Sequence, residues 1–204
     1  MSHDSYVHLA RAGAPSAPIL FVFHGTGGDE NQFFEFGKCL LPNATVISPR
    51  GDISEHGAAR FFRRKAEGIY DCEDLARATG RMAEFIAANR AHHQAGPVIG
   101  LGFSNGANIL ANVLIEKPGL FDAAVLMHPL IPFEPKSAAE KAASRILITA
   151  GEVDPVAPVE LTQALADYFK RRGDEVTLEW HPGGHEIRQN EIGAAKRFLS
   201  SYLQ

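Results

Sequence analysis

The chain contains six short apolar runs, separated by longer segments in which apolar residues recur at helical spacing. Runs this short and this apolar are typical of parallel strands buried on both faces, and the segments between them favour helices. Their alternation predicts an α/β fold with a mostly parallel central sheet and helices on both of its faces. The predicted strands are residues 19–23, 44–47, 98–103, 123–127, 146–149 and 176–180.

The rest of the chain adds one weaker edge strand and no further domain. Residues 6–11 are predicted to form this edge strand, ahead of a turn at residues 13–18. No internal repeat, low-complexity tract or linker divides the chain, and 204 residues can bury one sizeable core. We therefore expect one domain over residues 1–204.

Charge and hydropathy exclude several classes of protein. The formal net charge is −4, and no basic cluster is larger than the one at residues 62–65, so binding to nucleic acid is not expected. No apolar run is long enough for a membrane span, and the first residues lack the basic-then-apolar order of a signal peptide. The expected location is the cytoplasm. Cys39 and Cys72 match no zinc or redox spacing, and a disulfide between them is left as an alternative.

The turn after the third predicted strand carries the most informative motif. Gly102 to Gly106 reads Gly-Phe-Ser-Asn-Gly and matches G-x-S-x-G, in which two small residues let strand and helix approach while the serine holds a strained backbone. A phosphate cradle is the alternative. A dinucleotide fingerprint needs glycine where the chain has Asn105, and a P-loop needs a Gly-Lys-Ser/Thr sequence that is absent. The pattern favours Ser104 as a nucleophile.

A serine nucleophile needs a general base and a group that orients the base. His185 stands in a Gly-Gly-His loop after the last predicted strand, and His181, at the end of that strand, is its alternative. Asp154 follows the strand at residues 146–149, with Glu152 as the alternative acid. The order serine, acid, histidine along the chain is that of the α/β-hydrolase arrangement.

Acyl transfer also needs hydrogen-bond donors for the developing oxyanion. One is expected from the backbone N–H of Asn105, and the other from Thr26, in the sequence His-Gly-Thr-Gly-Gly after the first buried strand. The same segment is also interpreted as a turn in which Asp29 caps the helix through Phe33, Phe34 and Leu40. Both interpretations can hold together.

No metal or other cofactor is expected. His92 and His93 are neighbours that point apart on a helix, and no carboxylate cluster or H-E-x-x-H motif accompanies them. His3, His8 and His56 lie near the chain start or in a loop and are interpreted as solvated.

Taken together, these segments resemble the phospholipase/carboxylesterase family of small α/β-hydrolases, which includes bacterial carboxylesterases and acyl-protein thioesterases. The resemblance covers nearly the whole chain, through FVFHGTGGDENQF, GLGFSNGANI, AGEVDPVAP and HPGGHEI. It implies Ser104, Asp154 and His185 as the catalytic triad and the amides of Thr26 and Asn105 as the oxyanion hole. It also implies a possible homodimer.

The chain departs from the acyl-protein thioesterases at two positions. These relatives usually carry glutamine at the position of Asn105 and leucine at that of Thr26, and both residues would act through the main chain. Dienelactone hydrolases share the fold but resemble the chain less, because their nucleophile is cysteine.

The predicted function is hydrolysis of short-to-medium acyl esters of small molecules through an acyl-serine. The alternatives are a thioesterase or lysophospholipase activity, and a non-catalytic binding module on a hydrolase fold. The short connection between Met127 and Ile146 leaves no room for a lid domain. Arg60, Arg63 and Arg64 are interpreted as solvated. The alternative is that they bind an acidic leaving group of the substrate. The predicted substrate-lining residues are Phe61, Phe62, Ile69, Leu130, Ile131 and Phe133.

Overall fold

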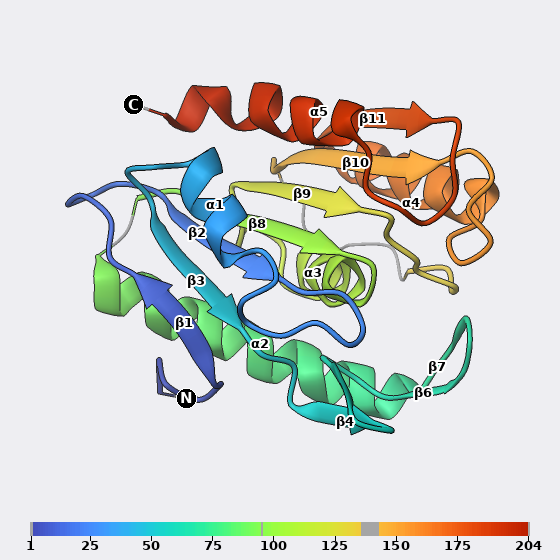
Figure 1. Cartoon of the computed structure of the whole chain (residues 1–204), viewed down its shortest axis with the longest axis horizontal. Helices are drawn as coiled ribbons and strands as arrows, with labels where there is room; N and C mark the ends of the chain where they lie inside the picture. Colours follow the sequence, from blue (N-terminus) through green and yellow to red (C-terminus); the bar gives the residue numbers. More distant parts are fainter. Residues whose placement is uncertain (1, 95, 136–142, 204) are drawn as a thin grey trace.

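The central sheet of the computed structural model runs in the order β1-β3-β2-β8-β9-β10-β11 (Figure 1). The structure describes residues 2–94, 96–135 and 143–203. All neighbouring strands are parallel except β1, which pairs antiparallel with β3. The strands are β1 (His8–Arg11), β2 (Ile19–Phe23), β3 (Thr45–Pro49), β8 (Val98–Phe103), β9 (Ala123–Met127), β10 (Arg145–Gly151) and β11 (Glu175–His181).

The predicted sheet is confirmed. Each of the six apolar runs forms a strand. β3 begins one residue and ends two residues later than predicted, and β10 and β11 extend one or two residues beyond the predicted ends. The weaker run near the chain start forms the edge strand β1, paired over His8–Arg11 alone. Because β2, β8, β9, β10 and β11 are parallel, the residues that follow them gather at one edge of the sheet.

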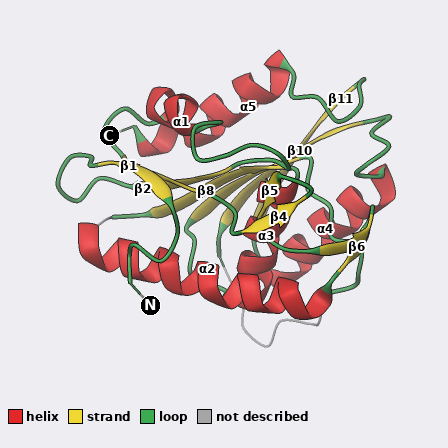
Figure 2. Cartoon of the chain, turned by 60° about the horizontal axis from the view of Figure 1, so that its bottom comes forward, coloured by secondary structure: helices red, strands yellow, loops and turns green. Residues whose placement is uncertain are grey.

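Helices cover both faces of the sheet (Figure 2). One face carries α2 (Cys72–His93), α3 (Asn105–Glu116) and α4 (Val159–Arg172), and the other carries α1 (Phe34–Leu40) and α5 (Gln189–Leu199), which a 3-10 turn at Ser200–Tyr202 extends. Alternate residues of β2 serve the two faces: Phe21 packs with the first set of helices and Val22 with the second. Burial of both faces explains why these strands are apolar throughout.

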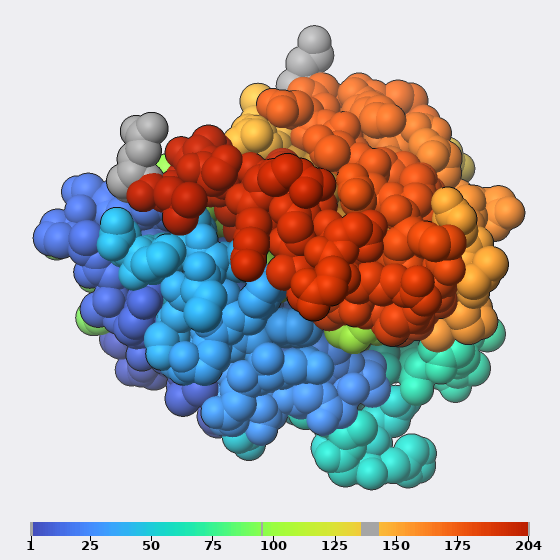
Figure 3. All heavy atoms as spheres, turned by 45° about the horizontal axis from the view of Figure 1, so that its top comes forward, coloured from blue at the N-terminus to red at the C-terminus, as the bar shows by residue number. Residues whose placement is uncertain are grey.

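The connection between β3 and α2 forms two small hairpins that the sequence did not predict. They are β4 (Ile53–Glu55) with β5 (Ala58–Arg60), and β6 (Arg64–Ala66) with β7 (Ile69–Tyr70). Figure 1 shows them outside the central sheet, at the end where β8 and β9 finish. In Figure 3 the teal atoms of this part of the chain project from the surface. The same view shows the red C-terminal helix beside the blue N-terminal segments.

Two sequence interpretations change in detail. Asp29 caps a turn, since its Oδ1 accepts from the amide of Asn31 at 2.9 Å, and α1 begins later, at Phe34, without a side-chain cap. Cys39 and Cys72 are both exposed and free, so they form no disulfide. Among the described residues, no helix combines the length and the apolar character that crossing a bilayer requires.

Candidate active site

Ser104 occupies a strained turn between β8 and α3. Its φ of 52° and ψ of −119° are an unusual conformation for a residue with a side chain. A Cβ on Gly106 would lie 2.4 Å from the carbonyl oxygen of Phe23, and one on Gly102 would lie 2.6 Å from the backbone of Gly106. The two glycines of the motif therefore permit the close approach of strand and helix, and the strain is held in place by packed backbone.

Ser104, His185 and Asp154 form one hydrogen-bonded chain. Nε2 of His185 lies 2.8 Å from Oγ of Ser104, and its Nδ1 lies 2.7 Å from Oδ2 of Asp154. Ser104 follows β8, Asp154 follows β10 and His185 follows β11, so the parallel sheet brings the three together. The Asp154 side chain is fully buried, whereas about a quarter of the His185 side chain is exposed.

The carboxylate of Asp154 is held by its own loop as well as by histidines. Its Oδ1 accepts from the amides of Val156 and Ala157 at 2.8 and 3.0 Å. Burial alone raises the pKa of Asp154, but the hydrogen bonds from His128, His185 and these two amides outweigh it and hold the pKa below its ordinary value. Asp154 is therefore ionised at neutral pH. The alternative acid Glu152 is exposed.

A second histidine, His128, shares this carboxylate, and the sequence analysis did not identify it. Its Nδ1 lies 2.8 Å from Oδ2 of Asp154, and its Nε2 lies 3.1 Å from Oε1 of Glu191. Burial lowers the pKa of His128, but hydrogen bonds to Glu191 and Asp154 reverse the effect and raise it. A carboxylate oxygen therefore lies at each ring nitrogen of His128, an arrangement that favours the protonated imidazole. The sequence signal that could have identified His128 was its position directly after β9.

Glu191 and His181 complete this buried network. Nε2 of His181 lies 3.2 Å from Oε2 of Glu191, while Oε1 accepts from the hydroxyl of Thr149 at 2.6 Å. The alternative base His181 therefore faces Glu191, whereas His185 faces the serine. Burial raises the pKa of Glu191, but its hydrogen bonds from His128 and Thr149 and from the backbone amide of Arg188 bring it below its ordinary value.

The same network contains donor atoms close enough together to hold a metal ion. Two groups qualify among the described residues, His128 with His181 and Glu191, and His128 with Asp154 and His185. In the first group, the two imidazoles face separate oxygens of Glu191, one nitrogen to each. Hydrogen bonding between imidazole N–H groups and carboxylates accounts for this arrangement without an ion.

The loop after β2 reaches the same site. His24 is buried, its Nδ1 donates to the carbonyl of Gly25 at 2.7 Å, and its Nε2 accepts from the amide of Gly51 at 2.9 Å. Because Nε2 accepts, the imidazole is neutral, which agrees with the lowering of its pKa by burial. The amide of Gly27 donates to the carbonyl of Ala59 at 3.0 Å, so the loop is fixed to β5.

Thr26 and Asn105, the predicted oxyanion residues, line one small cavity with Ser104. The volume of this cavity is about 30 Å³. Asn105 is buried, and its Oδ1 accepts from the amide of Phe61 at 2.8 Å, which fixes the first residue of α3 to the hairpin segment. Both predicted amides thus belong to residues beside the serine.

Of the six predicted lining residues, Leu130 lies in the wall of this cavity. Phe61 and Phe62 are buried and pack against the rings of Phe23 and Tyr70, respectively. The remaining three lie elsewhere: Ile69 is exposed on β7, and Ile131 and Phe133 line a separate groove beside α4.

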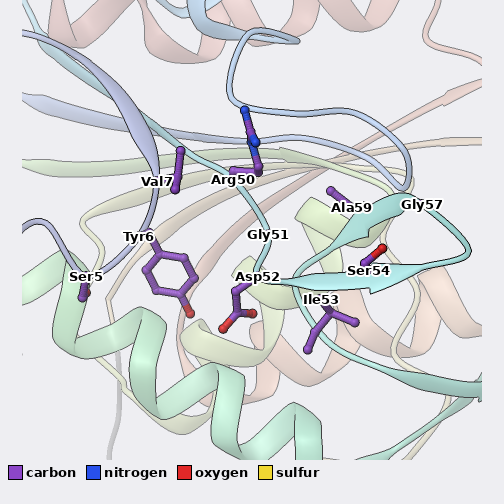
Figure 4. Close-up of a pocket in the computed structure, with 10 residues that line it drawn as sticks. All are labelled: Ser5, Tyr6, Val7, Arg50, Gly51, Asp52, Ile53, Ser54, Gly57 and Ala59. Carbon is purple, nitrogen blue, oxygen red and sulfur yellow. The ribbon is translucent and has the colours of Figure 1, made fainter.

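A larger hollow lies between the start of β1 and the segment after β3 (Figure 4). Its lining includes Tyr6, Arg50 and Asp52, and none of Ser104, Asp154 and His185 belongs to it. It is therefore separate from the candidate site.

Comparison with known proteins gives consistent matches over the whole chain. The model of the Phospholipase/Carboxylesterase family matches residues 5–203. The protein MhqD of Bacillus subtilis is 34% identical over 198 residues, which are 96% of this chain and 98% of that protein.

Two solved structures show the same fold. The protein Atu2452 of unknown function from Agrobacterium tumefaciens is 67% identical, with a TM-score of 0.96 over 99% of each chain. The Bacillus cereus carboxylesterase is 32% identical, with a TM-score of 0.92 over 98% of this chain and 95% of that one.

Proposed function

The chain belongs to the phospholipase/carboxylesterase family of hydrolases, and we propose that it is a serine carboxylesterase that cleaves short acyl esters. The observation that carries the proposal is the unbroken hydrogen-bonded chain from Oγ of Ser104 through His185 to Asp154. A binding module without catalytic activity would have no need for this chain.

In the proposed reaction, Nε2 of His185 takes the proton of Ser104 as the serine oxygen attacks the ester carbonyl carbon. The imidazolium then returns a proton to the leaving alcohol, and an acyl-serine remains. Water, deprotonated by the same histidine, hydrolyses the acyl-serine and restores the hydroxyl. Asp154 stays ionised and keeps the Nδ1 proton of His185 directed toward itself.

The negative charge that develops on the carbonyl oxygen needs donors in place before the reaction. We assign this task to the backbone amides of Thr26 and Asn105, whose residues line the cavity beside Ser104. Each such donor lowers the barrier by a few kcal/mol. The hydrogen bonds from Gly27 to Ala59 and from Phe61 to Asn105 support the proposal, because they fix both segments to the β4–β7 region.

The size of the cavity supports short acyl groups. A volume of about 30 Å³ is far below that of typical small-molecule pockets. We therefore expect acetyl to butyryl esters to be hydrolysed faster than long-chain esters and long-chain acyl thioesters.

A fluorophosphonate probe tests the proposed nucleophile. The probe should add one covalent label, located at Ser104 by peptide mass spectrometry, because it reacts with activated serines. His185→Ala should abolish labelling, whereas His56→Ala, at an exposed turn, should not. Absence of labelling in the folded wild-type protein would refute the proposal.

A further inference from the structure

The wall of the cavity beside Ser104 contains an arginine that the sequence analysis interpreted as solvated. Arg60 is only 3% exposed, and its guanidinium lies over the ring of Phe62. Its Nη1 donates to Oγ1 of Thr26 at 2.7 Å, and its Nε donates to the carbonyl of Phe62 at 3.3 Å. The neighbouring Arg63 does match the solvated interpretation, because more than half of its side chain is exposed.

Arg60 forms one ion pair among the described residues, with Glu55, and this pair is not hydrogen-bonded. The Glu55 carboxylate lies 3.6 Å from Nη1, beyond hydrogen-bond distance, and its other oxygen accepts from Arg64 at 3.0 Å. None of the residues that the structure describes hydrogen-bonds to Nη2 of Arg60. A guanidinium removed from water without a hydrogen-bonded anion is costly. Burial has the largest effect on the pKa of Arg60 and lowers it. The nearby positive charge of Arg64 lowers it further.

A second guanidinium, that of Arg64, lines the same cavity. Glu67 also lines the cavity and forms an ion pair with Arg64. The Glu67 side chain is 64% exposed on the turn between β6 and β7. Replacing an exposed partner of this kind costs little, because exposed ion pairs contribute at most about 1 kcal/mol. A carboxylate that enters the cavity can therefore take the place of Glu67 at Arg64.

We propose that the substrate is a short ester that carries a carboxylate, and that this carboxylate binds the buried guanidinium of Arg60, with Arg64 beside it. The inference rests on the proposed esterase function and adds the chemical class of the substrate. A guanidinium fork presents paired N–H groups to a carboxylate, which neutral esters cannot use equally well. The carboxylate supplies the hydrogen-bonded anion that the buried arginine lacks among the described residues.

Arg60 also touches Thr26, so its substitution will affect hydrolysis of every ester. The informative quantity is therefore a ratio, kcat/KM for a carboxylate ester divided by kcat/KM for the matching neutral ester. Monomethyl succinate against dimethyl succinate tests a carboxylate on the acyl side. O-acetylglycolate against its methyl ester tests one on the alcohol side.

For the wild-type protein, we expect the ratio to exceed tenfold in at least one pair. Arg60→Gln should lower that ratio at least tenfold, since hydrogen bonds to charged groups contribute this much or more. Arg60→Lys, which keeps the charge but not the fork, should retain part of the preference. Arg63→Gln is the matched control on the solvent side and should leave the ratio unchanged. Thr26→Val should slow both members of a pair equally.

Binding provides a test that does not depend on turnover. Titration calorimetry should detect succinate binding to the Ser104→Ala variant and a loss of at least tenfold in affinity when Arg60→Gln is added. Circular dichroism confirms that each variant is folded. A ratio near one in both pairs, or a ratio and succinate affinity unaffected by Arg60→Gln, would overturn the inference while leaving the esterase function in place. If no ester is hydrolysed, the proposed esterase function fails, and the inference that rests on it fails too.

Discussion

Nδ1 of His128 lies 2.8 Å from Oδ2 of Asp154, the same oxygen that faces His185. Two imidazoles thus share one carboxylate oxygen, one on the path to the serine and one in the core. His128 also faces Glu191 and His181 on its other side. His128, buried between the buried carboxylates of Asp154 and Glu191, joins β9 to the β10–α4 loop and to α5 beneath the site.

Removing the His128 imidazole should strongly destabilise the protein. His128→Asn should lower the free energy of unfolding by about 3 kcal/mol, because it leaves two buried carboxylates without their shared partner. Urea denaturation measures the change. His56→Asn is a matched control, since both histidines have a φ of 52° and asparagine tolerates that conformation. His56 is exposed, so its replacement should cost less than about 0.5 kcal/mol. Equal losses would contradict the ion network.

The contribution of His128 should depend on pH in a definite direction. Its pKa is raised in the folded protein, so its stabilising effect is complete below the unfolded pKa of about 6.5 and is lost as the pH rises through the folded value. The stability difference between wild type and His128→Asn should therefore be larger at pH 6 than at pH 10. Urea titrations at both values check this, and a difference that grows with pH would contradict it.

The opposite sign applies to the carboxylates. The pKa values of Asp154 and Glu191 are lowered by their hydrogen bonds, so their contribution is present above the ordinary carboxyl pKa of about 4 and is lost as the pH falls below it. Unfolding of the wild-type protein at pH 3 should need less urea than at pH 6. An unchanged midpoint would show that the network contributes no net stability.

Substitution of the two candidate acids should separate their roles. Asp154→Asn should lower kcat by about 10⁴-fold, because the amide fails to hold the required tautomer of His185. Glu152→Gln, in the same loop but exposed, should keep nearly full activity. Initial rates with a short-chain p-nitrophenyl ester measure both. Near-normal turnover in Asp154→Asn would transfer the role to another group.

Two glycines at helical positions should respond in opposite ways to alanine. Gly106→Ala places a Cβ 2.4 Å from the carbonyl oxygen of Phe23, so the strand and helix must separate at a cost of about 1–3 kcal/mol, with loss of activity. Gly80→Ala, in the middle of α2 with open space around it, should stabilise the protein by about 0.5–1 kcal/mol. Thermal unfolding distinguishes them, and similar shifts in Tm would contradict the steric argument.

The sheet was predictable because its signal is local. The residues of β2, β8 and β9 are apolar on both faces, which few other structures require. Ser104, Asp154 and His185 could be selected because each follows a strand, and parallel strands end at the same edge. The hairpins β4–β7 were missed, because strands of two or three residues with mixed polarity carry no periodic signal.

The buried network was only partly accessible from sequence. His128 follows β9 and meets the same positional rule that selected Asp154. Glu191 lies in the first turn of α5, where acidic residues are ordinary, and its complete burial comes from packing between α5 and the sheet. The burial of Arg60 could not be predicted from the sequence either. It results from the contact of β5 with Thr26, which the polar sequence of this loop does not indicate.

The hairpin segment β4–β7 separates the residues proposed to bind the substrate from those proposed to carry out the reaction. Ser104, Asp154 and His185 follow strands of the sheet, whereas Arg60 and Arg64 come from the segment between β3 and α2. This segment packs on the sheet through the buried Phe61, whose ring lies against that of Phe23. It is also hydrogen-bonded to Gly27, Thr26 and Asn105. We therefore expect that grafting this segment into a related protein changes both its substrate preference and its catalytic rate. Selection would then act on the two traits together.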